Sequence, residues 1–236
     1  MYPQVKNQHS EKFCCKCHLL TCACLCEKVP RLKTEAVFFL LVHSRELSKG
    51  SNTGHLLLNA LVSCEYELWS RVEQPKKLMP YLKDQNLKSQ SYQPYLVFSP
   101  DENPPKLSSD TQSKSDAVEN HRSAGQPDKI LNQKRPLYIL IDATWQQARK
   151  MVRQSPYLTT LPRMSLHCVQ KSHYRLRRNQ QAEGMSSCEA AIALLQQSGD
   201  LDSANALQAY FQAFMLHYDA SMSGHGVSRV PLILSE

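Results

Sequence analysis

Short apolar runs alternate with amphipathic segments along most of the chain, and this alternation predicts the secondary structure. The runs at 36–42 (AVFFLLV) and 137–141 (LYILI) are continuously apolar and rich in β-branched and aromatic residues. Such runs are typical of strands that are buried on both faces of a parallel sheet. Residues 65–70 alternate between polar and apolar side chains, which predicts a further strand, and we expect shorter strands at 95–98 and 165–169.

Helices are expected between these strands. The predicted helices cover residues 55–61, 76–84, 144–154, 186–197 and 203–218. In the last of them one face collects the apolar side chains of Ala206, Ala209, Tyr210, Ala213 and Phe214. Strands that alternate with helices predict an α/β domain with a largely parallel sheet and helices on both faces. Ligands of such sheets bind beyond the carboxyl ends of the strands, which here are the loops after Val42, Phe98, Ile141 and Val169.

Composition excludes several classes of protein. Hydrophobic residues make up 42% of the 236 residues, too many for a predominantly disordered chain. No apolar run approaches the roughly 20 residues that a membrane-spanning helix needs, and the polar N-terminus has no apolar signal region. We therefore expect a cytoplasmic protein that has no membrane partner. Residues 101–134 nearly lack large apolar side chains, which predicts a flexible insertion.

Cysteines are concentrated near the N-terminus, where six of the nine lie between Cys14 and Cys26. Cys14 and Cys17 form a C-x2-C pair, and Cys24 and Cys26 form a C-x-C pair. Two such pairs can converge on one tetrahedral metal ion, so we predict a structural Zn²⁺ site with four thiolate ligands in an N-terminal module over residues 1–34. Disulfides and free thiols are the alternatives. The spacing also leaves open whether Cys22 replaces Cys24 as a ligand.

Charge is distributed unevenly along the chain, whose formal net charge is +7. No acidic residue lies between Asp142 and Glu183, and this segment carries Arg149, Lys150, Arg153, Arg163, Lys171, Arg175, Arg177 and Arg178. A continuous basic segment suggests a polyanionic partner, most often a nucleic acid. Tyr174 beside three of these arginines would suit base stacking and phosphate contacts. A solvated basic face is the alternative.

Two helix starts carry candidate chemistry. Asp142 ends a predicted strand, and Thr144 and Trp145 open the helix that follows. A carboxylate in this position is a candidate base or ligand-orienting group, and a helix N-cap is the alternative. Ser186 and Glu189 match a capping box, and the same helix end could instead bind an anionic carboxylate.

The order of these motifs resembles the DTW-domain family, named for its Asp-x-Thr-Trp motif. The resemblance runs from about Cys14 to Tyr218. It comprises the cysteine pairs, His43 with Glu46 and Asn52-Thr53-Gly54, Ser99-Pro100, the segment from Asp142 to Met151, Tyr174 to Arg177, and Ser186 to Ala190. Two departures stand out. Ser187-Cys188 replaces the family's usual Thr-Leu, and His43-Ser44-Arg45-Glu46 replaces its His-Pro-x-Glu.

The resemblance implies an activity, a fold and a set of site residues. Length and the N-terminal cysteines are similar to the bacterial branch of tRNA-uridine aminocarboxypropyltransferases. These enzymes transfer the 3-amino-3-carboxypropyl group of S-adenosylmethionine to N3 of a tRNA uridine. A SPOUT-like knotted fold is implied for residues 35–236. The oligomeric state stays open, with a slight preference for a monomer. The implied catalytic residues are Asp142, Thr144 and Trp145; the implied donor-binding residues are Asn52, Thr53, Gly54, Ser99, Pro100, Ser186 and Glu189; the RNA-binding residues are Arg149, Lys150, Arg175, Arg177 and Arg178.

Two other functions fit the same residues. An RNA methyltransferase would use the same donor but direct its methyl group at the nucleophile. A zinc-ribbon protein could bind RNA without catalysis. The sequence does not show which uridine is modified, nor which group removes the proton from N3.

Overall fold

The computed structural model describes residues 12–14, 16–83, 90–98, 134–164, 166 and 185–223. Its strands are β1 (Val37–Val42), β2 (Cys64–Leu68), β3 (Tyr92–Val97), β4 (Arg135–Asp142) and β5 (Arg163–Met164). Its α-helices are α1 (Gly54–Ala60), α2 (Met79–Leu82), α4 (Trp145–Arg153), α5 (Pro156–Thr159), α6 (Ser187–Gln197) and α7 (Leu201–Ser223). Within this part of the chain, no helix is long and apolar enough to cross a membrane.

The described strands form a five-stranded sheet in the order β2-β1-β4-β3-β5, and every neighbouring pair is parallel. Strands β1 and β4 lie side by side in register from Val37↔Leu137 to Val42↔Asp142. Both faces of these two strands are covered, which explains the continuous apolar runs at 37–42 in β1 and 137–141 in β4. The predicted parallel α/β sheet is confirmed.

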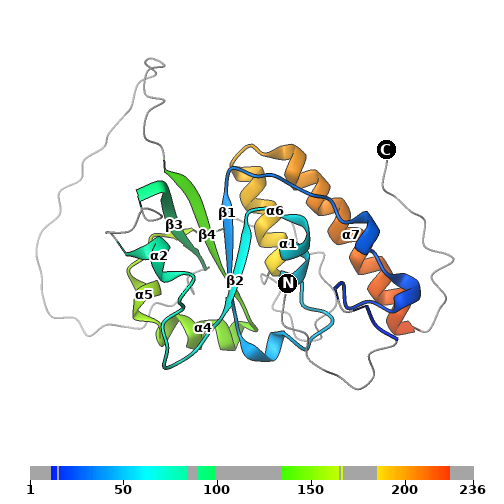
Figure 1. Ribbon diagram of the computed structural model, residues 1–236, viewed down its shortest axis with the longest axis horizontal. Coiled ribbons are helices and arrows are strands. Elements are labelled where there is room, and N and C mark those ends of the chain that lie inside the picture. The colour runs from blue at the N-terminus through cyan, green and yellow to red at the C-terminus, as the bar shows by residue number, and fades with distance from the viewer. Residues whose placement is uncertain are drawn as a thin grey trace, which may run out of the picture.

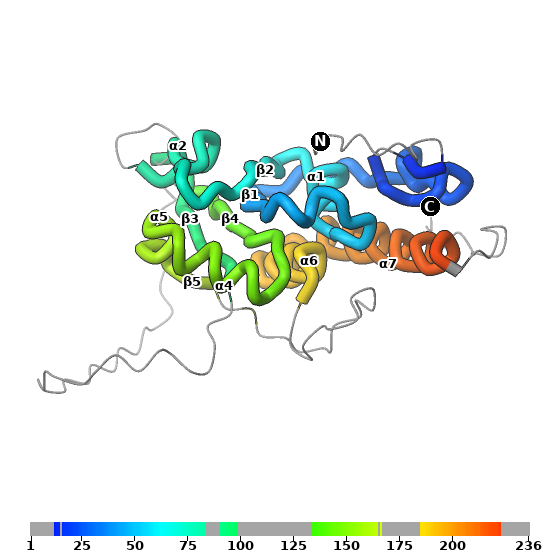
Figure 2. Tube along the Cα trace, turned by 90° about the horizontal axis from the view of Figure 1, so that it is seen from below, coloured from blue at the N-terminus to red at the C-terminus, as the bar shows by residue number. Residues whose placement is uncertain are grey.

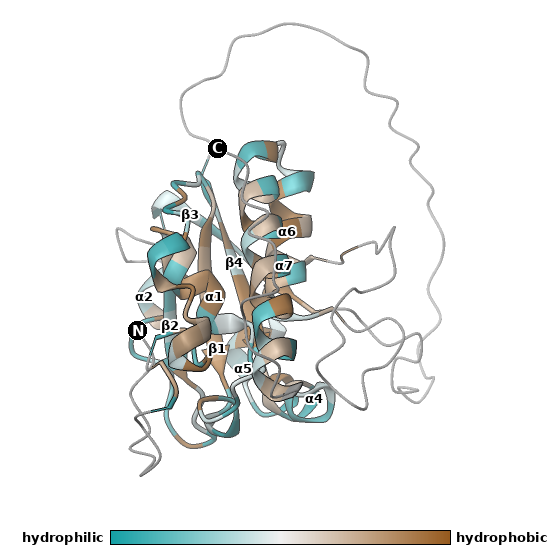
Figure 3. Cartoon of the chain, turned by 90° about the vertical axis from the view of Figure 1, so that its right-hand side faces the viewer, coloured by the Kyte–Doolittle hydropathy of each residue, from teal (hydrophilic) through white to brown (hydrophobic). Residues whose placement is uncertain are grey.

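Helices cover both faces of the sheet, as predicted, and alternate residues of β1 divide between them (Figures 1 and 2). Phe38, Leu40 and Val42 join the hydrophobic cluster that contains α1, α6 and α7. The intervening Val37, Phe39 and Leu41 join the cluster that contains α2, α4 and α5. The sheet is therefore the middle layer of three, and Figure 3 shows its central strands as the most hydrophobic part of the chain.

The N-terminal segment packs onto the first of these clusters. Leu19, Ala23 and Leu25 are 1–2% exposed and belong to the same hydrophobic core as α7. The Nδ1 atom of His217, on α7, lies 2.9 Å from the carbonyl oxygen of Ala23. Residues 12–34 thus share a core with the sheet domain.

Most of the predicted elements are confirmed, with shifted ends. The last helix extends from Leu201 to Ser223, longer than predicted, and its buried face includes Tyr210 and Phe214. Pro156 does more than end α4, because it also opens the short helix α5. Of the strand predicted at 165–169 the structure describes only Leu166, which lies outside the strand that pairs with β3, Arg163–Met164.

Two further predictions are not tested by the described residues. The insertion predicted at 101–134 is described only at Lys134. The knot implied by the family resemblance stays a prediction.

Candidate active site

The candidate site lies where the connections of the sheet diverge. The chain leaves β1 through α1 toward β2, at one edge, and leaves β4 through α4 and α5 toward β5, at the other edge. Strands β1 and β4 are neighbours, so their carboxyl ends are the topological switch point of the sheet. Ligands of open α/β sheets bind at such points, because the two loops separate and leave a crevice.

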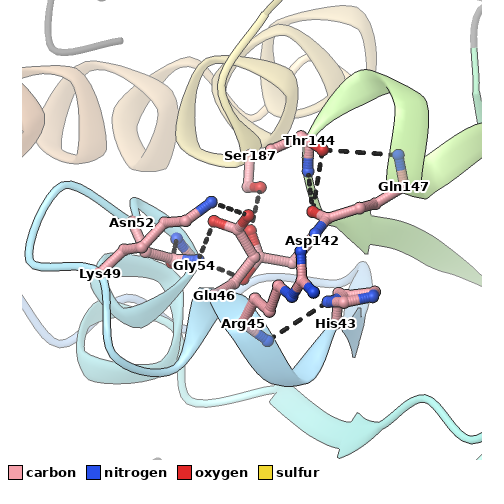
Figure 4. A network of polar contacts seen from close by, with 10 residues as sticks. All are labelled: His43, Arg45, Glu46, Lys49, Asn52, Gly54, Asp142, Thr144, Gln147 and Ser187. Carbon is pink, nitrogen blue, oxygen red and sulfur yellow. Dashed lines mark hydrogen bonds and ion pairs between the residues drawn. The ribbon is translucent and has the colours of Figure 1, made fainter.

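Asp142 ends β4 at this point and joins three segments of the chain (Figure 4). Its Oδ2 atom accepts a hydrogen bond of 2.8 Å from Nδ2 of Asn52, in the loop after β1. Its Oδ1 atom accepts a hydrogen bond of 2.8 Å from Oγ of Ser187, at the start of α6. Asp142 is 1% exposed, so these bonds form away from bulk water, where an unmade bond is costly. We call this arrangement the carboxylate clamp.

A second buried carboxylate lies in the loop after β1. Glu46 is 1% exposed, and its Oε1 atom pairs with Nζ of Lys49 at 2.6 Å. Its Oε2 atom lies 3.5 Å from the same Asn52 amide nitrogen that binds Asp142. The Oδ1 atom of Asn52 accepts a hydrogen bond of 2.7 Å from the amide of Gly54. The Asn52 amide nitrogen therefore lies between two carboxylates, Glu46 from the loop and Asp142 from β4.

Thr144 and Trp145 follow Asp142 along the chain and begin α4. Thr144 is the N-cap of α4 and forms a capping box with Gln147, so the helix cap is two residues beyond Asp142. Asp142 itself is still in β4, opposite Val42, and the alternative that it caps the helix is wrong. Trp145 is half-buried and stacks on Phe98, which follows β3, with ring centroids 5.2 Å apart. Trp145 is thus part of a ring pair beside the site.

Ser186 and Glu189 form the capping box predicted from their spacing. The Glu189 amide donates to Oγ of Ser186 at 3.3 Å, and the Ser186 amide donates to the Glu189 carboxylate at 2.8 Å. The amide of Cys188, which directly precedes Glu189, donates to Oγ1 of Thr53 at 3.3 Å. Side chains thus already satisfy two amides in the first turn of α6, and that turn is fixed against the loop after β1.

The remaining candidate residues lie partly outside the described chain. Arg149 and Lys150 are exposed on α4, near the site. The structure does not describe Ser99, Pro100, Arg175, Arg177 and Arg178. Their proposed contacts with donor and RNA stay predictions.

Four cysteine sulfurs form a separate cluster near the N-terminus. Those of Cys14, Cys17, Cys24 and Cys26 all lie within 4.8 Å of one another. The Cys14–Cys26 and Cys17–Cys24 sulfurs are 3.5 and 3.7 Å apart. Four sulfurs about 2.3 Å from a tetrahedral Zn²⁺ would be roughly 3.8 Å apart, so the spacing fits this ion. Cys22 is exposed and lies outside the cluster, which favours Cys24 as the ligand, and none of the described cysteines is in a disulfide.

The thiols of this cluster are crowded enough to affect each other's ionisation. Burial opposes ionisation of Cys14, but hydrogen bonds from backbone amides and neighbouring thiols outweigh it and lower its pKa to about 7. Burial, and then the ionised Cys14, raise the pKa of Cys17 to about 11. Cys14 therefore ionises readily, whereas burial and the charge on Cys14 oppose ionisation of Cys17. A bound cation removes this opposition, which is a further reason to expect a metal.

Sequence reasoning did not include three of the groups at this site. Ser187 lies beside the predicted anchor Ser186, but it is the one that contacts Asp142. Glu46 is one of the residues that resemble the family motifs, but the sequence did not indicate that its carboxylate is buried at the site. Phe98, the partner of Trp145, directly precedes the Ser-Pro motif, and its position at the end of a predicted strand was the available signal.

Comparison with protein families identifies a model that matches most of the chain. The family model described as DTW domain matches residues 11–219, which is most of the chain. This span includes the cysteine cluster, the carboxylate clamp and both terminal helices. No solved structure matches the chain significantly.

Proposed function

Since this chain belongs to the DTW-domain family, which is linked to tRNA modification, we propose that it is a tRNA-uridine aminocarboxypropyltransferase. It transfers the 3-amino-3-carboxypropyl group of S-adenosylmethionine to N3 of a uridine. In this reaction the bond from uridine N3 to the γ-carbon forms while the bond from the γ-carbon to sulfur breaks. The electron pair stays on sulfur, which leaves as neutral methylthioadenosine, and the proton of N3 is released.

The carboxylate clamp is the observation that carries this proposal. The donor is a sulfonium cation, and Asp142 provides a carboxylate that is fixed by Asn52 and Ser187 at the switch point. A fixed charge in a water-poor site attracts a cation more strongly than the same charge in water. We assign to Asp142 the role of this charge rather than that of a base, because both of its oxygens already accept hydrogen bonds and it is 1% exposed.

Other residues of the site would orient the donor. Asn52, Thr53 and Gly54 form the buried turn next to the clamp, and we retain them as donor-binding residues. Ser186 and Glu189 act indirectly, since their capping box fixes the turn from which Ser187 reaches Asp142. Orientation decides the chemistry, because the γ-carbon rather than the methyl group must face the nucleophile. A SPOUT-like knotted path is part of the same proposal.

Zinc would have a structural role in this protein. Four thiolates complete a tetrahedral coordination sphere and leave no position for a substrate, so the ion would cross-link the N-terminal segment. The cluster belongs to the same hydrophobic core as α1 and α7. We therefore propose that the metal stabilises the face of the sheet domain that carries α1.

The deciding experiment is mass analysis of nucleosides. Unmodified tRNA is incubated with the protein and S-adenosylmethionine and then digested. We expect a uridine carrying the aminocarboxypropyl group together with an equal amount of methylthioadenosine. A methylated nucleoside with S-adenosylhomocysteine would instead identify a methyltransferase, and tRNA binding without any product would identify a non-catalytic RNA-binding protein.

Basic side chains on α4 should contribute to tRNA binding. Arg149 and Lys150 are exposed and lie on the helix that begins at the site. We expect Arg149→Ala/Lys150→Ala to weaken tRNA binding by roughly a hundredfold or more, since each lost hydrogen bond to a charged group contributes about 1.5–3 kcal/mol and about 1.4 kcal/mol corresponds to a factor of ten. The slope of log affinity against log salt should fall by roughly one for each phosphate that the double variant no longer neutralises.

A matched control tests whether this effect is local. Arg31 and Lys33 are exposed near the amino end of β1, at the opposite edge of the sheet. Arg31→Ala/Lys33→Ala removes the same charge and should leave the salt slope unchanged. Equal slopes for both double variants would contradict a tRNA contact on α4. Fluorescence anisotropy of a labelled tRNA transcript at several salt concentrations measures both.

A further inference from the structure

A second ring pair lies on the other side of Asp142 from Trp145. His43 directly follows β1 and Trp69 directly follows β2, so the parallel pairing of these strands places both residues at the carboxyl edge of the sheet. Their rings are stacked, with centroids 6.1 Å apart and an interplanar angle of 20°. Both residues are half-buried, so part of the pair stays accessible to solvent. We call this pair the His43–Trp69 shelf.

The shelf is held in place by hydrogen bonds. The indole Nε1 of Trp69 donates to Oγ of Ser155 at 2.9 Å, and the Trp69 amide donates to the carbonyl of Val42 at 2.8 Å. The Nδ1 atom of His43 accepts from the amide of Arg45 at 3.2 Å. These rings therefore have a fixed orientation, and their aromatic faces remain the principal surface for a ligand.

The same hydrogen-bond pattern links the shelf to the carboxylate clamp. The amide of His43 donates to the backbone carbonyl of Asp142 at 3.0 Å. Since the Phe98–Trp145 pair follows β3 and β4, Asp142 lies between two aromatic pairs along the edge of the sheet. Two such platforms would suffice for the two planar bases that the proposed reaction brings together, the adenine of the donor and a base of the RNA.

Charge around the shelf suits a polyanion. Arg45 and Lys150 are exposed, and together with Lys49 they act electrostatically on His43. Burial is the main cause that lowers the pKa of His43, and these three cations lower it further, against Glu46. At neutral pH the imidazole is therefore uncharged and can stack, while the exposed Arg45 and Lys150 can contact phosphates and Lys49 pairs with Glu46.

We infer that the His43–Trp69 shelf is a stacking platform for a nucleobase of the RNA substrate, with Arg45 and Lys150 beside it to contact the phosphate backbone. This inference rests on the proposed function for its assumption that RNA is the substrate. It assigns to Trp69 a contact that lies outside the motifs shared with the family. The donor's adenine is the competing occupant, and the experiments below distinguish the two.

Fluorescence can separate the two aromatic platforms, because the chain has only two tryptophans. In Trp145→Phe the emission reports on Trp69 alone. We expect an unmodified tRNA transcript to quench this emission on binding, and S-adenosylmethionine to leave it unchanged. Quenching by S-adenosylmethionine would overturn the inference. So would unchanged emission at RNA concentrations where anisotropy shows the transcript to be bound.

Substitution of Trp69 provides an independent test. Trp69→Leu removes the stacking surface and should weaken tRNA binding roughly tenfold, within the range known for base stacking. Trp69→Phe keeps a ring and should restore most of the affinity. Donor affinity, measured by calorimetry with S-adenosylmethionine, should be unchanged in both variants. Ser155→Ala, which removes the hydroxyl that accepts from the indole but leaves the ring of Trp69 in place, is the structural control.

The outcomes separate this inference from the proposed function. If the wild-type protein modifies tRNA while Trp69→Leu binds it with unchanged affinity, the shelf is not an RNA platform and the proposed function stands. If no nucleoside is modified but RNA still quenches Trp69, the shelf is an RNA-binding site and the proposed activity is wrong. A parallel loss of donor and tRNA affinity in Trp69→Leu would assign Trp69 a purely structural role and overturn the inference.

Discussion

Replacing Asp142 by Asn is expected to lower the rate of tRNA modification by two to three orders of magnitude. The variant keeps the shape of the side chain but loses the charge; its amide oxygen can still accept from Asn52, while its NH2 group donates to Oγ of Ser187 in place of accepting from it. A pair of opposite unit charges about 4 Å apart contributes roughly 4 kcal/mol at an effective dielectric constant near 20. Because about 1.4 kcal/mol corresponds to a factor of ten, donor affinity and turnover should both fall. Calorimetry with S-adenosylmethionine and single-turnover assays measure the two effects.

The pH dependence of this variant distinguishes a fixed charge from a base. If Asp142 removed the proton from N3, activity of Asp142→Asn would recover at high pH, where uridine loses that proton to solvent. If Asp142 acts as a fixed charge, the loss persists at every pH and is accompanied by weaker donor binding. Asp202→Asn is a matched control, because Asp202 is exposed in the first turn of α7, on a different element from the site. A wild-type rate in Asp142→Asn would contradict both roles.

Removing the metal is expected to lower the melting temperature by about 10 °C. Zinc binding contributes roughly 10–16 kcal/mol to the folding of small zinc fingers. Losing even about 4 kcal/mol lowers the melting temperature by this amount, since 1 kcal/mol corresponds to roughly 2–4 °C in a chain of this size. The effect should spread beyond the cysteine cluster, because Leu19 and Leu25 are buried in the same core as α7. Calorimetry before and after chelation, with metal analysis, measures this loss.

Two cysteine variants provide the matched comparison. Cys17→Ser removes one ligand, and it should lose both the metal and the stability of the holoprotein. Cys22→Ser changes an exposed cysteine of the same segment that lies outside the cluster, and it should keep both. Identical metal content and melting temperature in the two variants would contradict the assigned ligand set.

Hydrogen exchange should show how far the loss of metal extends. The rings of His18 and His55 stack 5.0 Å apart, which connects the cysteine segment to α1. Burial first, and then His18, lower the pKa of His55 to about 3, so its ring is neutral. Neither ring nitrogen of His55 has a partner at hydrogen-bond geometry in the part of the chain that the structure describes. Chelation should therefore increase exchange in α1 and α7 while α4 and α5, on the opposite face, stay protected.

The buried strands were predictable from the sequence, but their arrangement was not. A strand covered on both faces must be apolar at every position, and 36–42 and 137–141 satisfy this condition. Hydrophobic periodicity contains no information on which strands pair. That β1 lies beside β4, so that Asn52 meets Asp142 across 90 residues, is a tertiary property. The strand predicted at 165–169 is described only at Leu166, and the pairing of β5 with β3 uses Arg163 and Met164, which precede it.

The departure from the family pattern at Ser187-Cys188 has a physical explanation in the structure. Ser187 stands where the family usually has Thr, and the contact with Asp142 uses only a hydroxyl group, which both residues possess. Cys188 stands where Leu is usual and is 0% exposed, so it acts as a small apolar side chain in the core. Sequence alone could not show this, because it does not reveal which of two adjacent serines faces the site.

The carboxylate clamp can be complete only after most of the chain has been synthesised. Its bonds connect residues that are 90 and 45 positions apart, and contacts of such long range form late in folding. A nascent chain that has released β4 but not α6 already has the inner strands of its sheet, yet it lacks the hydroxyl group that completes the clamp. Ser187 must therefore have left the ribosome before the clamp can be complete, and a chain truncated ahead of α6 would lack one of the three segments that the clamp joins.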